Sequence, residues 1–90
     1  MKSSLKNEYE YIKFDLKLFE VFPAGQKVGI DYPKNVTIFD EDSDAAMNEF
    51  LDLFPENIGY QFGDLYEDEE IIELVNAKND NVIAVYTMKF

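Results

Sequence analysis

Hydrophobic and polar positions alternate with a period of two in several parts of the chain, and this pattern predicts strands. The alternation is strictest at residues 11–18, where one face would be buried and the other solvated. The run at 82–90 predicts a second strand, and the shorter runs at 27–32 and 35–39 bring further residues that favour a pleated surface. Pro and Gly at residues 23–26 indicate a turn that reverses the chain. Together these segments predict a small antiparallel sheet.

One segment, residues 43–54, has the period of a helix instead. Its apolar positions, at i, i+3, i+4 and i+7, are Met47, Phe50, Leu51 and Phe54. Asp42 or Ser43 can cap its N-terminus, and Pro55 supplies the stop. We therefore expect an α+β fold, a single domain over residues 1–90 in which one amphipathic helix packs on the sheet and residues 1–7 are frayed.

Two segments between this helix and the last strand are less regular. Gly59 and Gly63 bracket several aromatic residues, so residues 56–65 are predicted to be a loop that carries large aromatic side chains. Residues 71–77 leave two alternatives open. They can pair with the last strand as a hairpin, or the acidic residues before them can open a second short helix near 65–76.

The composition excludes most catalytic chemistry. The chain has 90 residues, 47% of them hydrophobic, which is enough apolar surface for one modest core. It contains no cysteine and no histidine, so thiolate nucleophiles, zinc–thiolate sites and the commonest general base are all missing. There is no glycine-rich phosphate loop, no apolar run of membrane length and no signal-peptide core. We expect a cytoplasmic protein that is not an enzyme and needs no cofactor.

The distribution of charge narrows the choice of partner. The chain has eight lysines, no arginine and 19 carboxylates, which give a formal net charge of −11. Thirteen of the carboxylates lie between Asp40 and Glu73, whereas no lysine occurs between Lys34 and Lys78. Such a field repels nucleic acid and anionic membranes. The expected partner is a basic protein surface or a cation.

The first acidic run, residues 40–44, places oxygens where a calcium-binding loop begins. The match fails at loop position 6, where Ala45 replaces the glycine of the sharp turn, and at position 12, where Leu51 replaces the bidentate glutamate. Helix capping explains much of this run, and no metal site is predicted. Weak divalent binding is the alternative.

The remaining carboxylates suggest a nucleic-acid mimic, the competing interpretation being a solvated surface that keeps a small domain soluble. Glu49, Asp52 and Glu56, at helical spacing, would present a phosphate-like row on the solvent face. The tetrad at residues 67–70 would accept arginine side chains that otherwise read DNA. Nearby aromatic side chains, which could equally belong to the core, would anchor the contact.

The order of elements from residue 38 onward, followed by the pentapeptide Tyr66-Glu67-Asp68-Glu69-Glu70, resembles the small Cas9-inhibiting anti-CRISPR proteins that mimic DNA. That resemblance implies a phage-type inhibitor whose acidic tract occupies the arginines of a Cas9-class nuclease. The alternatives are an immunity protein against a basic nuclease toxin and a non-inhibitory acidic adaptor or structural phage protein. The expected partner-binding residues are Asp40, Asp42, Asp44, Glu49, Asp52, Glu56, Tyr60, Phe62, Asp64, Tyr66, Glu67, Asp68, Glu69 and Glu70.

Overall fold

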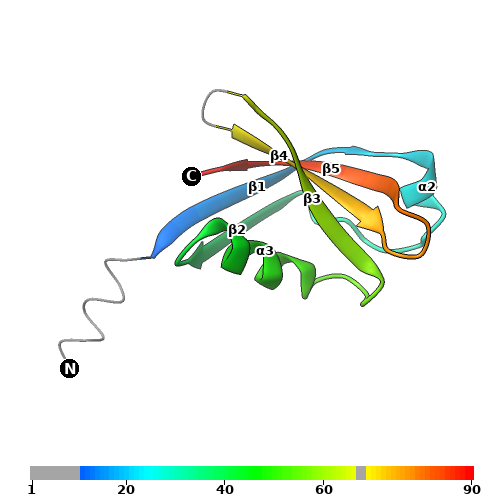
Figure 1. Ribbon diagram of the computed structural model, residues 1–90, viewed down its shortest axis with the longest axis horizontal. Coiled ribbons are helices and arrows are strands. Elements are labelled where there is room, and N and C mark those ends of the chain that lie inside the picture. Colours follow the sequence, from blue (N-terminus) through cyan, green and yellow to red (C-terminus); the bar gives the residue numbers. More distant parts are fainter. Residues whose placement is uncertain (1–10, 67–68) are drawn as a thin grey trace.

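A twisted antiparallel sheet of five strands, with one helix across it, forms the fold (Figure 1). The computed structural model describes residues 11–66 and 69–90, apart from the side chains of residues 64–66. The elements in chain order are β1 (Ile12–Val21), α2 (Pro23–Gln26), β2 (Asn35–Asp40), α3 (Ser43–Leu51), β3 (Ile58–Tyr66), β4 (Glu69–Asn76) and β5 (Asn81–Lys89). The strand order is β2-β1-β5-β4-β3, and every pairing is antiparallel. The expected α+β class is confirmed.

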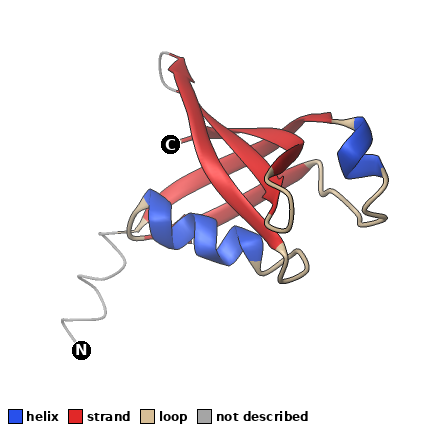
Figure 2. Cartoon of the chain, turned by 45° about the vertical axis from the view of Figure 1, so that its right-hand side comes forward, coloured by secondary structure: helices blue, strands red, loops and turns tan. Residues whose placement is uncertain are grey.

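Helix α3 lies on one face of the sheet, named here the covered face, and leaves the other face open (Figure 2). The alternation in β1 matches this arrangement, because Phe14 and Leu16 are buried on the covered face while Lys13 and Lys17 are exposed on the open face. A bulge between Leu18 and Glu20 shifts the register of β1 against β5. The strand pairing is therefore irregular near the C-terminal end of β1.

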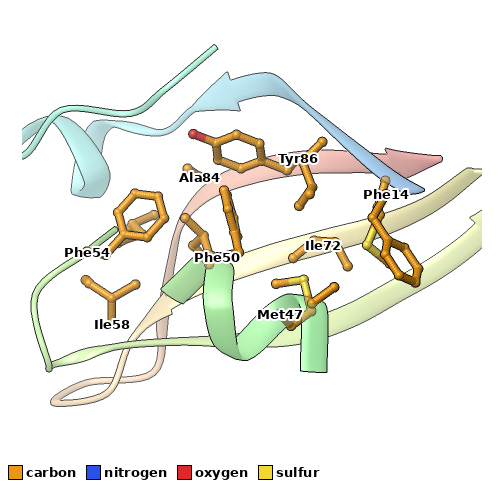
Figure 3. Close-up of a cluster of buried hydrophobic side chains, with 13 residues drawn as sticks. Phe14, Met47, Phe50, Phe54, Ile58, Ile72, Ala84 and Tyr86 are labelled. Carbon is orange, nitrogen blue, oxygen red and sulfur yellow. The ribbon is translucent and has the colours of Figure 1, made fainter. Parts of the chain in front are cut away.

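The core contains aromatic and aliphatic side chains from α3 and from both halves of the sheet (Figure 3). Phe50 is completely buried and makes edge-to-face contacts with Phe54 and Tyr86, at ring-centroid distances of 5.2 and 4.9 Å. The Tyr86 hydroxyl donates a hydrogen bond of 2.6 Å to the carbonyl of Pro33, and burial raises the pKa of this tyrosine. The segment after β1 is thereby tied to the core.

Helix α3 begins as expected but ends early. Asp42 is the N-cap, and its Oδ1 accepts a hydrogen bond of 2.9 Å from the Ala45 amide. The helix ends at Leu51 and not at Phe54. Residues 52–54 form tighter turns before Pro55, because their backbone amides donate hydrogen bonds to the carbonyls three residues earlier. None of the helices in the described ranges is long and apolar enough to span a membrane.

Two local predictions were wrong, and the structure decides between the two alternatives for residues 71–77. Residues 56–65 are not a loop, since Ile58–Tyr66 is strand β3, in which Ile58, Tyr60 and Phe62 alternate with smaller or polar residues. A second short helix does not form near 65–76, because residues 69–76 are strand β4, which pairs with the last strand, β5, as the hairpin alternative expected. Residues 27–32 are a turn and an irregular segment rather than a strand, and residues 23–26 form the one-turn helix α2.

The glycine at position 63 explains why the third strand was missed. Gly63 suggested a loop, but a Cβ added there would lie 3.0 Å from the Ile71 Cγ2 atom of β4. The position is a site of close side-chain approach next to the register shift of β3, which is a common role for a glycine inside a strand. Residues 67–68 and 1–10 lie outside the described residues, so the expected fraying of residues 1–7 stays a prediction.

Candidate functional site

The acidic surface, as we define it, comprises the carboxylates at the end of β2, on α3 and in the turn after α3. Its members are Asp40, Glu41, Asp42, Asp44, Glu49, Asp52 and Glu56. The helix creates this surface by its own amphipathic pattern, because burial of Ala46, Met47 and Phe50 directs the polar side of α3 to solvent. Glu49, Asp52 and Glu56 are all exposed.

No described lysine neutralises this surface. The described residues contain a single ion pair, between Lys13 Nζ and Asp15 Oδ2 at 4.0 Å, and it lies on the open face. The acidic surface therefore carries its negative charge uncompensated by any cation of the described chain. Uncompensated charge of one sign destabilises the compact state and creates a strong local potential.

Carboxylates within the acidic surface crowd one another. A hydrogen bond with the Asp40 carboxyl group, together with partial desolvation and the negative charges of Asp40 and Asp52, raises the pKa of Glu49. The end of β2 and the second turn of α3 therefore bring like charges close together.

Asp44, near the start of α3, lies beside Tyr60 of β3. Burial, reinforced by the charge of Asp44 and a hydrogen bond with it, raises the pKa of Tyr60. The Tyr60 ring in turn contacts Phe62 edge-to-face at a centroid distance of 5.3 Å. Tyr60 packs against the core, as one interpretation expected, whereas Phe62 is 38% exposed, and its role as a partner anchor stays a prediction.

The predicted carboxylate row does not lie along one helix face, because α3 ends before Asp52 and Glu56. Glu49, Asp52 and Glu56 nevertheless come together around one open hollow of about 580 Å³, with Leu51, Phe54, Pro55 and Ile58 among its apolar lining. Two of the carboxylates sit at the C-terminal end of α3, where the helix dipole disfavours negative charge. In place of the predicted row, the three carboxylates form an acidic rim around a hollow with an apolar floor.

Half of the acidic tetrad at residues 67–70 belongs to β4, which begins at Glu69. Glu67 and Asp68 lie outside the described residues. Glu69 pairs with Lys89 and Glu70 with Met88 in the β4–β5 register, so successive side chains point to opposite faces. Glu69 also lines a small hollow on the open face with Lys17 and Lys89. The described half of the tetrad is therefore divided between two faces, and one member has lysine neighbours.

The two remaining predicted residues lie at the end of β3. Asp64 and Tyr66 belong to this strand, and Tyr66 pairs with Glu69, but their side chains lie outside the described parts. Sequence reasoning missed an exposed apolar cluster on the open face around Phe19. The signal was present, because Phe19 is apolar where the alternation of β1 calls for a polar residue.

No group of three or more acidic side chains within the described ranges is arranged to hold a metal ion. Every buried polar side-chain atom described has a hydrogen-bond partner, so no orphaned group points to a missing ligand there. Comparison with protein-family models, with curated proteins and with solved structures finds no match.

Proposed function

We propose that this protein is a non-catalytic inhibitor that mimics nucleic acid, and that its acidic surface binds the basic surface with which a nuclease holds DNA. The observation that carries the proposal is the concentration of seven carboxylates around α3 without a described lysine at ion-pair distance. This arrangement costs stability at Glu49 and at the C-terminal end of the helix. A binding role gives a reason for that cost.

The hollow next to α3 suits arginine side chains in particular. Carboxylates accept the paired N–H groups of a guanidinium, and such charge-assisted bonds are among the strongest in proteins. The apolar floor formed by Leu51 and Phe54 suits the aliphatic stem of the same side chain. The rim carboxylates Glu49, Asp52 and Glu56 would then take the positions that phosphates hold on DNA.

The resemblance of the chain to anti-CRISPR proteins favours a Cas9-class nuclease as the target. Its motif-reading arginines are exposed once guide RNA is loaded, and they normally make bidentate contacts with guanine. The inhibitor would act in the cytoplasm of the host cell, where that complex forms. Glu67 and Asp68, which lie outside the described residues, would extend the proposed contact, of which the acidic surface is the main part.

A competition assay tests the proposal. Fluorescently labelled duplex DNA with the adjacent motif is bound to a guide-loaded Cas9-class nuclease, and its release by the inhibitor is followed by anisotropy. We expect displacement of the DNA, weakened by added salt because phosphate-like contacts are screened. The variant E49K/D52K/E56K should weaken displacement at least about tenfold, the effect of a single lost charge-assisted contact.

The control variant E20K/D31K/E73K makes the same change in net charge outside the acidic surface and the tetrad, with Glu20 and Glu73 on the open face and Asp31 before β2. It should retain most of the activity, because only the general field changes. Folding of the first variant is not at risk, since lysines at the C-terminal end of α3 are favoured by the helix dipole. Equal loss in both variants, or displacement that is indifferent to salt, would contradict the proposal.

A further inference from the structure

An exposed apolar cluster lies on the open face of the sheet, away from α3. Phe19 is 71% exposed, and it lines a mainly apolar hollow of about 470 Å³ together with the half-buried Ile71, Val85 and Thr87 and with Glu69. The cluster spans the adjacent strands β1, β5 and β4, because Ile71 pairs with Thr87 and the bulge of β1 brings Phe19 next to Val85. Contiguous apolar surface of this kind usually marks an interface.

The charges around this cluster have both signs, in contrast to the acidic surface. The open face carries the lysines Lys13, Lys17 and Lys89 and the carboxylates Asp15, Glu20, Glu69 and Glu73. Half of the six described lysines are therefore gathered on one face of a chain whose net charge is −11. Two copies that approach through their open faces meet less repulsion there than at the acidic surface, and each lysine can find a carboxylate on the other copy.

The size of the open face also suits a second copy. Strands of six to ten residues, at roughly 3.3 Å per residue, and four strand spacings of roughly 4.8 Å give a flat area of about 500 Å² per copy. The accessible area of the side chains on it is larger than the flat area. It thus approaches the ~800 Å² per partner of an ordinary specific interface.

We propose that the open face is the interface of a two-fold symmetric homodimer. Phe19 of each copy packs into the apolar hollow of the other, and the mixed charges of the rim pair across the axis. The two sheets stack face to face at about 10 Å, as in a sandwich. Both acidic surfaces then point outward, so the dimer does not depend on the proposed function and does not block it.

Sedimentation velocity of the purified protein, from micromolar to submillimolar concentration, tests the dimer without any nuclease. We expect a concentration-dependent monomer–dimer equilibrium that salt leaves unchanged or strengthens, because salt screens the repulsion between two acidic copies. Binding through the acidic surface has the opposite salt dependence. The variant F19D should raise the dissociation constant at least about tenfold, as expected for a central aromatic anchor.

The matched control is L53D, which places the same charge on another exposed apolar residue, 56% exposed, next to α3. It should leave dimerisation unchanged. Amide chemical shifts of the wild type, followed on dilution, give a readout that needs no variant, and the largest changes should occur at the open-face positions of β1, β4 and β5. A wild type that stays monomeric throughout the range, or shifts confined to α3, would overturn the proposal.

Discussion

The aspartate at position 42 has two separable roles, as a helix cap and as part of the acidic surface, and two substitutions distinguish them. Asp42→Ala removes the acceptor of the 2.9 Å bond from the Ala45 amide together with the charge, whereas Asp42→Asn removes the charge and keeps an acceptor of the same shape. Loss of an N-cap costs about 1 kcal/mol, and asparagine caps as well as aspartate.

The expected stability difference between the two variants follows from these values. Asp42→Ala should lower the free energy of unfolding by about 1 kcal/mol, roughly a tenth of the stability of a domain of this size. That corresponds to a fall in Tm of about 4–8 °C. Asp42→Asn should stay near the wild type, because the weaker interaction with the helix dipole is offset by relief of repulsion from neighbouring carboxylates.

The assay is urea and thermal unfolding, followed by circular dichroism, at low and high salt. The gap between the two variants should not depend on salt, since it reflects a hydrogen bond. In the DNA-displacement assay, by contrast, both variants should be weakened to the same extent, because both lose the charge. Equal stability of the two variants would refute the capping argument, and unequal displacement would refute the role of Asp42 in the field.

Two further predictions concern backbone packing and pH. Gly25→Ala would force a Cβ against the carbonyl oxygen of Ile83 on β5, so it should lower the free energy of unfolding in urea by about 3 kcal/mol, near the upper end for overpacking. Gly59→Ala is the mild control, because its Cβ would meet only the Val75 Cγ2 atom, at 3.6 Å. Equal destabilisation by the two substitutions would contradict this prediction. The raised pKa of Glu49 means that its carboxyl group favours folding below its ordinary pKa of 4.5 and that this contribution is lost as pH rises through the folded-state pKa. Glu49→Gln should therefore raise Tm at neutral pH and reduce the loss of stability between acidic and neutral pH; an unchanged pH profile would show that the Asp40 contact carries no energy.

Elements whose pattern reflects local burial were predictable from the sequence. The strict alternation of β1 and the i, i+3, i+4 spacing of Met47, Phe50 and Leu51 each report which side of an element meets the core. β3 has the same kind of alternation, but in the sequence alone Gly59 and Gly63 are typical of a loop. Their role depends on Val75 and Ile71 of β4, which are neighbours only after the strands pair.

The candidate site was less predictable than the fold, because charged residues that are far apart in the sequence can become neighbours when the strands pair. Glu69 stands in a run without lysine, yet sheet pairing places Lys89 directly opposite it. The cluster around Phe19 likewise combines side chains from three strands. The carboxylates of α3 stay close to their sequence neighbours within one turn of helix, and for this reason the acidic surface was more predictable from the sequence than the surroundings of the tetrad.

The strand order has a consequence for how the chain reaches its native state. β5, the last strand along the chain, lies between β1 and β4, so the centre of the sheet closes only when residues from the two ends of the described chain meet. Contacts this distant in sequence are slow to form. Until β5 inserts, β1 and β4 expose pairing edges, and a nascent or truncated chain that stops before residue 81 should be prone to aggregation and dependent on chaperones.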